Sequence, residues 1–232
     1  MGSVYPSARP GPPPLHWVKP PQQARSQKTL ENMLDAAEAL IAEGGVAALT
    51  VSEVVRRAGS SVGAFYARFP DKDALLSTLH ERSCSESLAT AELALDPLRW
   101  ESAEIGTAVF EVVRFTATMS RERRGLLLAF IALAASDAAY AERRARLDAG
   151  LSDLLYAFLR TREAELSHPD LRVAADVSIR MIMGSLEYGA TIVGAASETR
   201  PSGDRLSHEL ARAVLSYLGA NDAAQQPPRR PR

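Results

Sequence analysis

His80 and Cys84 are residues whose types and spacing could do chemistry. Four residues apart on a predicted helix, they share a face and could form half of a metal site or a thiol and base pair. His16, His168 and His208 are scattered, and the sequence shows neither a glycine-rich phosphate loop nor a distinguishable pair of catalytic acids. We therefore predict no enzyme, no catalytic residue, no metal and no cofactor, and keep a redox-sensing thiol at Cys84 as a less favoured alternative.

A different kind of chemistry is indicated between Thr50 and Lys72, where the pattern is that of two short helices joined by a tight turn. Thr50 and Glu53 have the spacing of a capping box, which starts the first short helix. Gly59 permits the turn, and Ser60 or Ser61 can cap the next helix. Such a helix-turn-helix can place its second helix in the major groove of DNA.

The flanking segments predict the helices that support this pair. One helix follows Ser26 and stops at Gly44 and Gly45. Another begins at Asp71, a suitable N-cap, and continues to about Leu95. Helical spacing in the first of them places these apolar residues on one face: Leu30, Met33, Leu34, Ala37, Leu40 and Ile41.

The remainder also has helical periodicity and lacks a convincing alternating strand. Predicted starts lie near Asp137, at Ser167 or His168 and near Ser202, with Pro169 in a first helical turn. The predicted ranges are 101–119, 122–135, 138–166, 169–196 and 204–218. We expect an all-α fold of about nine helices, with a three-helix head on a helical body.

Composition sets the broad class. The 232 residues are 46% hydrophobic with a net charge of −1, which suits a globular protein and gives no general attraction for a polyanion. Residues 1–72 carry eight Lys and Arg against six Asp and Glu, so the weak positive excess lies in the predicted head. Without an apolar leader or an uncharged apolar run longer than 125–136, we expect a cytoplasmic protein with no membrane partner.

The predicted domains follow composition and motifs. Residues 1–24 form a Pro-rich flexible arm, 25–72 the helix-turn-helix domain, 73–220 the body, and 221–232 a flexible basic tail. Lys19, Arg25 and Lys28 could enter a minor groove, although solvated linker charges are at least as good an explanation.

The stretch Leu49 to Leu75 resembles the DNA-binding domain of the tetracycline-repressor-like (TetR) family, as does the preceding Leu34-Asp35-Ala36-Ala37. Its glycine, tyrosine, phenylalanine and lysine occur in one register with the motif. The resemblance implies an all-helical bacterial homodimer, cytoplasmic and nucleoid-associated when bound to DNA. It also implies a ligand-binding body, and a recognition helix at about Val62 to Arg68.

The resemblance also assigns the DNA contacts by position. Thr50, Tyr66 and Lys72 would bind phosphate, and Gly63 would allow a close backbone approach. Ser61 and Arg68 would reach phosphate or a base edge, with Arg56 and Arg57 beside the groove. The sequence departs from the family pattern at Val55, Ser60 and Ala64. With Val62 and Ala64 facing DNA, we expect some contact with thymine methyl groups.

The body offers candidates for an effector pocket and for a dimer interface. Aromatic, sulfur and polar residues that could line a pocket are Trp100, Phe110, Phe115, Met119, Phe130, Tyr156, Met181 and Glu187. Ordinary core packing is the more common role for each of them. The resemblance implies dimerisation through the last two long helices, with intrachain packing as the alternative; the candidates are Met183, Ala190, Leu210, Val214 and Tyr217.

Together these features predict a DNA-binding transcriptional regulator. Its partners would be a palindromic double-stranded operator, a second copy of the chain, and a small apolar or amphipathic effector that releases it. The alternatives are a ligand-independent regulator and a helical binding or scaffold protein that does not bind DNA.

Overall fold

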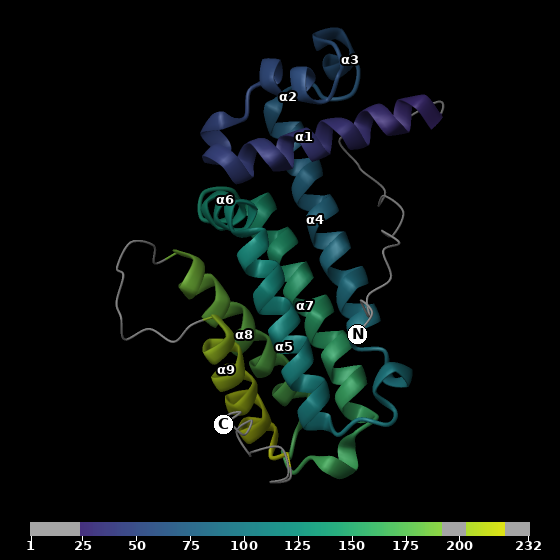
Figure 1. Cartoon of the computed structure of the whole chain (residues 1–232), viewed down its shortest axis with the longest axis vertical. Coiled ribbons are helices and arrows are strands. Elements are labelled where there is room, and N and C mark those ends of the chain that lie inside the picture. Colours follow the sequence, from purple (N-terminus) through teal and green to yellow (C-terminus); the bar gives the residue numbers. More distant parts are fainter. Residues whose placement is uncertain (1–23, 192–202, 221–232) are drawn as a thin grey trace, which may run out of the picture. The chain divides into compact units, whose positions relative to one another are not determined.

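The computed structural model describes residues 24–191 and 203–220, and these are helical throughout apart from turns and short connections (Figure 1). The elements are α1 (Ala24–Ala48), α2 (Val51–Arg57), α3 (Val62–Tyr66), α4 (Lys72–Ala94), η1 (Pro97–Trp100), α5 (Ile105–Glu122), α6 (Arg124–Ala134), α7 (Ala138–Arg160), η2 (Glu163–Glu165), α8 (Leu171–Thr191) and α9 (Gly203–Leu218). The predicted all-α fold is confirmed. The predicted arm and tail, and the end of the 169–196 helix, lie outside the described residues.

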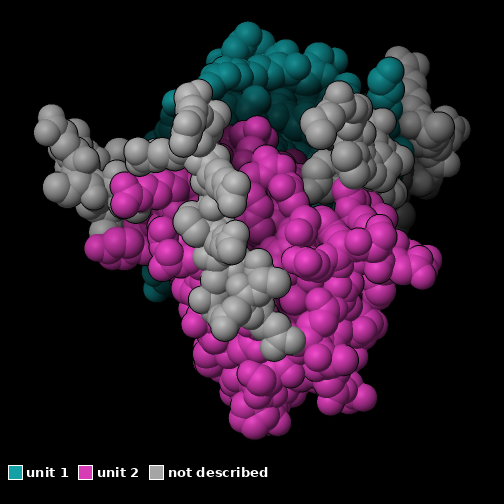
Figure 2. Space-filling model, turned by 60° about the horizontal axis from the view of Figure 1, so that its bottom comes forward, with its two compact units in different colours: residues 1–90, 129–147 teal, residues 91–128, 148–232 magenta. Residues whose placement is uncertain are grey.

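The chain divides into two compact units (Figure 2). Unit 1 contains residues 1–90 and 129–147, and unit 2 contains 91–128 and 148–232. The division therefore falls inside α4, α6 and α7, and not at Lys72 where the sequence places the end of the head. Unit 1 takes in most of α4 and the corner between α6 and α7 together with α1, α2 and α3.

Short polar side chains begin the helices of unit 1, largely as predicted. The Thr50 hydroxyl accepts a hydrogen bond from the Glu53 amide at 3.2 Å, and Asp71 accepts one from Ala74 at 2.8 Å. Ser61, one of the two predicted caps, accepts from the Ala64 amide at 3.1 Å. The capping box is only half formed, because the Glu53 carboxylate binds Arg56 in place of the Thr50 amide.

The regular part of α1 ends at Gly44 and Gly45, as predicted, although helical turns resume through Ala48. Gly45 has φ of 67°, a left-handed conformation that residues with a side chain rarely adopt. A Cβ atom on Gly44 would lie 2.7 Å from the Cβ of Ala48. Both glycines are therefore required by the local backbone.

A buried arginine joins α1 to α4 within unit 1. The Arg82 side chain is 5% exposed, and its guanidinium contacts Glu31 at 3.4 Å, Asp35 at 2.8 Å and Glu38 at 3.0 Å. The three acids lie on one face of α1, at i, i+4 and i+7. Glu86, one turn further along α4, lies 3.8 Å away. The cluster compensates a buried cation and fixes α1 against α4.

Unit 2 has an apolar core built from α5, α7, α8 and α9, and its most enclosed members include Val113, Phe158, Leu159 and Leu218. In Figure 1, α5, α8 and α9 run side by side. The helix α5 begins at Ile105, four residues later than predicted, where the Glu165 carboxylate of η2 accepts a hydrogen bond from the Ile105 amide at 3.2 Å.

The start of α8 corrects another expectation. Asp170, and neither Ser167 nor His168, is the cap, accepting hydrogen bonds from the amides of Arg172 and Val173 at 2.9 and 3.0 Å. Pro169 precedes this cap and lies outside the first turn. The predicted Ser202 cap lies outside the described residues.

No single helix in the described ranges has the length and apolar character needed to cross a bilayer. The pair α6 and α7 meets these criteria only together, with a bend of 120° between them.

Replacing Arg82 with alanine should loosen α1 from α4. Four carboxylates would lose their shared cation, at a cost of about 3 kcal/mol, toward the lower limit for a buried ion pair because the acids are partly exposed. We expect amide hydrogen exchange across residues 30–41 to become about 100-fold faster. Arg56→Ala, which breaks an exposed pair in the same unit, should change exchange at these residues little. Equal exchange in the two variants would contradict the role given to Arg82.

Candidate nucleic-acid interface

The segment from α2 to α3 has the geometry of a helix-turn-helix. Between these helices Gly59 adopts a left-handed φ of 59°, and the Ser60 amide donates a hydrogen bond to the Val55 carbonyl at 2.9 Å. Val54 and Val55 are buried on the inner side of α2. The helix α3 ends at Tyr66, two residues earlier than the predicted recognition helix, although Arg68 and Phe69 still donate backbone hydrogen bonds to the Phe65 carbonyl.

Two phenylalanines anchor the inner side of α3. Phe65 and Phe69 are fully buried, with ring centroids 5.3 Å apart. The outer side is exposed: Val62 is 49% and Tyr66 52% accessible. The Tyr66 and Phe65 rings meet edge to face with centroids 5.3 Å apart, and this contact steadies the exposed tyrosine.

Most polar side chains near this outer face are engaged within the protein. The Thr50 and Ser61 hydroxyls cap α2 and α3. The Arg68 guanidinium donates to the Ala64 carbonyl at 2.9 Å, at the end of α3. Each of these predicted DNA contacts therefore has a structural role in the head as well.

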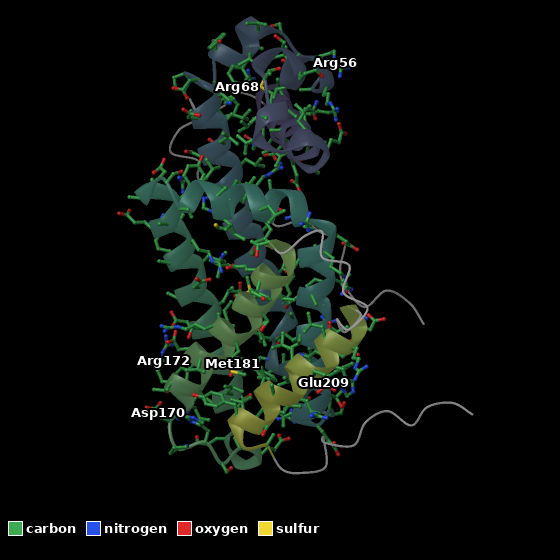
Figure 3. All side chains as sticks on the ribbon, turned by 90° about the vertical axis from the view of Figure 1, so that its left-hand side faces the viewer. Arg56, Arg68, Asp170, Arg172, Met181 and Glu209 are labelled. Atoms are coloured by element: carbon green, nitrogen blue, oxygen red, sulfur yellow. The ribbon has the colours of Figure 1, made fainter. Side chains whose placement is uncertain are left out.

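Two arginines on α2 are paired with acids. Arg56 binds Glu53 at 2.6 Å, and Arg57 forms a two-pronged pair with Glu43 at the end of α1. The hydrogen bond from Arg57 holds the pKa of Glu43 below its usual value, and that from Arg56 does the same for Glu53. Figure 3 shows Arg56 and Arg68 in the helix-turn-helix region.

Two further predicted contacts lie at the edges of the motif. Lys72 is half-buried and begins α4. Gly63, in the first turn of α3, is exposed, and a Cβ atom there would meet only the Ser61 hydroxyl, at 4.0 Å. Lys72 thus places a positive charge at the end of the motif, and Gly63 leaves space beside the α3 backbone.

His80 and Cys84 lie deep in unit 1, away from solvent. His80 is 4% exposed, stacked 5.0 Å from Tyr140 and 4.4 Å from Phe130, and its Nδ1 has no hydrogen-bond partner. Burial, aided by Arg143, lowers the pKa of His80 to about 4. Burial also raises the pKa of the Cys84 thiol to about 11, so the thiol lacks the lowered pKa of reactive cysteines. Among the described residues, no group of three or more His, Cys, Asp or Glu side chains is placed to hold a metal ion.

The predicted pocket residues are divided between the two units. Phe130 lies in unit 1 against His80, while the other seven belong to unit 2. Trp100 donates a hydrogen bond to the Ala94 carbonyl at 2.7 Å, and Phe110 contacts His208 at 5.2 Å. None of the eight lines the apolar cavity in the core of unit 2.

Unit 2 contains a small apolar cavity in its core. Its volume is about 20 Å³, and its lining is Leu95, Ala108, Val109, Val112, Val113, Leu155, Phe158, Ile182, Val214 and Leu218. A wider, open hollow of about 310 Å³ lies at the start of α8 and includes Tyr156. Two arginines that line it are paired within the protein. Arg160 donates a hydrogen bond to the Tyr156 hydroxyl and forms an ion pair with Glu163, and Arg172 forms an ion pair with Asp153. Figure 3 shows Arg172 and Asp170 at this end of unit 2.

The residues predicted at a dimer interface fall into two groups. Ala190, Leu210 and Val214 are buried within the subunit, and the last two belong to the core cluster that contains α5. Met183 and Tyr217 are half-buried, and the Tyr217 ring lies 4.9 Å from His168. For the buried group, intrachain packing, the alternative left open by the sequence, accounts for the side chains.

Fold and motif together define an all-helical protein with an N-terminal helix-turn-helix. Residues 33–79 match the family of bacterial regulatory proteins of the tetR family, which is the family that the sequence predicts. The head of this chain is therefore similar to a tetR-family regulatory domain over these residues.

Known relatives extend the likeness beyond the head. The HTH-type transcriptional regulator AcrR of Shigella flexneri is 35% identical over 111 residues, which is 46% of this chain and 49% of AcrR. The match thus spans about half the length of that relative.

Two solved structures share the fold. SmeT, the repressor of the Stenotrophomonas maltophilia multidrug efflux pump SmeDEF, has 23% identity and a TM-score of 0.64, covering 89% of this chain and 98% of SmeT. FadR from Bacillus subtilis, a transcriptional regulator in complex with stearoyl-CoA, has 20% identity and a TM-score of 0.61, covering 81% and 98%. Both comparisons extend the architecture across the body.

Acid should destabilise unit 1 through His80. Since the unfolded chain binds this proton with a pKa near 6.5 and the folded chain with one of about 4, the free energy of unfolding falls as pH drops between those values. The loss attributable to His80 is about 3 kcal/mol. His80→Phe should remove that part, so its melting temperature should fall less between pH 7 and pH 4.5. An identical fall in the two proteins would contradict the assignment.

Proposed function

We propose that the protein is a sequence-specific DNA-binding transcriptional regulator, and that it acts as a repressor. The observation that carries the proposal is the α2–α3 pair, whose inner side is anchored by Phe65 and Phe69 while its outer side is exposed. The tetR-family match over this segment supports DNA as the partner. Repression is supported by the likeness in fold to SmeT.

Phosphate binding is assigned to residues around the motif. The Tyr66 hydroxyl and the Lys72 ammonium can contact the DNA backbone on either side of the groove that receives α3. Thr50 can donate its hydroxyl hydrogen to phosphate while its oxygen accepts from Glu53, because a hydroxyl serves both roles at once. Arg56 can release the Glu53 carboxylate and bind phosphate instead at a small cost in free energy, because the ion pair is exposed.

A dimer would present two such motifs to a palindromic site. We assign the interface to the outward face of α8, which we call the Gly184 face: Arg180, Gly184, Tyr188 and Thr191. Tyr188 is 67% exposed, and a Cβ atom on Gly184 would meet nothing within 4 Å. A large aromatic beside an open glycine gives a surface that another helix can approach closely. Met183, half-buried on the same helix, would lie at its margin.

The effector site is assigned to the core cavity between α5, α7, α8 and α9. Its wholly apolar lining suits a hydrocarbon chain, and the fold relative FadR is in complex with stearoyl-CoA. Because 20 Å³ holds no more than a single water, the core helices must separate for a ligand to enter. A long-chain acyl-CoA that raises the melting temperature, where CoA alone does not, would support this assignment; equal effects would contradict it.

Lys72→Ala should weaken DNA binding in a salt-dependent manner. Each phosphate contact releases about one counterion. Loss of the Lys72 contact should therefore make the slope of log affinity against log salt less steep by about one unit. The measurement is a gel shift at several salt concentrations, on operator duplex and on random duplex. Arg114→Ala, which removes an exposed cation from unit 2, should leave the slope unchanged.

Two results would contradict this proposal. An unchanged slope in Lys72→Ala would remove Lys72 from the phosphate contacts. No sequence-selective binding by the unaltered chain would reject the regulator and favour a helical scaffold protein.

Tyr188→Glu should weaken the dimer. The aromatic contact would be lost and a carboxylate would have to be dehydrated on the Gly184 face, so we expect the dimer dissociation constant to rise at least 100-fold. Sedimentation equilibrium measures it. Leu98→Glu, at another exposed apolar residue outside α8, should leave the dimer intact. A dimer unaffected by Tyr188→Glu would place the interface elsewhere.

A further inference from the structure

The Glu53 carboxylate has one potential partner a helical turn before it and another a turn after it. The Arg56 guanidinium, one turn later, donates to its Oε2 atom from Nε at 3.1 Å and from Nη2 at 2.6 Å. The Thr50 amide, one turn earlier, is the partner that a complete capping box would supply. Within the described part of the chain, this amide donates no hydrogen bond. A second hydrogen bond to the carboxylate is therefore available at the start of α2.

The backbone around Thr50 already has the conformation of a capping box. Thr50 has φ of −120° and ψ of 152°, the extended conformation of an N-cap, and its hydroxyl accepts from the Glu53 amide at 3.2 Å. Only the side-chain torsions of Glu53 need to change for its carboxylate to reach the Thr50 amide. The Glu53 side chain is 41% exposed, and exposed side chains change rotamer within nanoseconds.

Charge decides which of the two partners the carboxylate binds. A guanidinium and a carboxylate are both charged, whereas the Thr50 amide is neutral, so Arg56 is the stronger partner in the free protein. A DNA phosphate offers Arg56 a partner of the same kind, and its negative charge repels the carboxylate. The carboxylate can then bind the Thr50 amide, in the first turn of α2, where the helix dipole favours a negative charge.

The neighbouring pair of Arg57 and Glu43 joins two helices. The Arg57 guanidinium binds both carboxylate oxygens of Glu43, which lies near the end of α1. The Arg57 side chain is 28% exposed, against 65% for Arg56. Exchange of the Glu43 carboxylate for phosphate would therefore cost a contact between α1 and α2. We assign the exchange to Arg56 and a structural role to Arg57.

We propose that Glu53 is a switch: in the free protein it pairs with Arg56, and on DNA, where Arg56 binds phosphate, it turns to the Thr50 amide and completes the capping box. The proposal rests on the proposed function and specifies how one of its phosphate contacts is controlled. Away from DNA, the pair lowers the net positive charge of α2. On DNA, a new hydrogen bond at the start of α2, the helix that packs against α3, offsets the loss of the ion pair.

The first experiment tests the second position without DNA. Arg56→Ala removes the stronger partner, so the carboxylate should move to the Thr50 amide in the free protein. We expect exchange of that amide hydrogen with water, measured by NMR, to become about tenfold slower, which corresponds to a box formed for about nine-tenths of the time. Adding Glu53→Ala to this variant should restore fast exchange. Arg114→Ala, which breaks a pair of the same spacing in unit 2, should leave exchange at Thr50 unchanged.

The second experiment tests the switch on DNA. The full chain selects an operator from a random duplex pool, and exchange of the Thr50 amide is measured in the complex. We expect it to be about tenfold slower than in the free protein. Glu53→Ala in complex with the same duplex should keep fast exchange, because this variant has the DNA but lacks the carboxylate. Shielding by DNA alone would instead slow exchange equally in the two complexes.

The contact between Arg56 and phosphate is tested by salt. Arg56→Ala should make the slope of log affinity against log salt less steep by about one unit on the operator. An unchanged slope would overturn the switch. So would equal exchange at Thr50 in the free Arg56→Ala and unaltered proteins, or in the operator complexes of the Glu53→Ala and unaltered proteins. Failure to select any duplex would instead reject the proposed function itself.

Discussion

The buried guanidinium of Arg82 is the interaction on which the position of the helix-turn-helix depends within unit 1. A cation that is 5% exposed must be compensated, and three acids from α1 and one from α4 do this. Charge pairs with short distances tolerate less sliding than apolar contacts do. The cluster therefore fixes α1, which in turn packs against α2, while the apolar residues of α1 supply most of the burial.

Local features of this head were predictable from the sequence because their causes are local. The capping hydroxyls, the glycines with positive φ and the apolar spacing of α1 act over at most a few residues. The Arg82 cluster was missed because its partners on α1 lie 44 to 51 residues away. An acidic stripe at Glu31, Asp35 and Glu38 was a visible signal, but an exposed stripe of a soluble helix has the same pattern. The shortened α5 has a similar cause, since Glu165 acts over 60 residues.

The body was harder to predict because aromatic and aliphatic residues serve several purposes. Phe130 packs against His80, and Leu210 and Val214 fill the core of unit 2. A stripe on a helix predicts that the stripe is buried, but it does not say whether the covering surface belongs to the same chain. The exposure of each side chain in the folded chain shows which surfaces are left uncovered, and on α8 these include Tyr188 and Gly184.

The small size of the head creates a conflict between folding and recognition. With five residues in α3, Ser61 and Arg68 at its ends also complete the helix, so any contact that they make with DNA has to be compatible with these hydrogen bonds. Exposed methyl groups and exposed backbone form no hydrogen bonds that stabilise the helix, so a contact between them and DNA would not weaken it. Arg56 and Arg57 are also used within the protein. Each is paired with a carboxylate, which lowers the net positive charge of the α2 region. In the proposed regulator, this would reduce affinity for arbitrary DNA, and discrimination would depend more heavily on the outer face of α3.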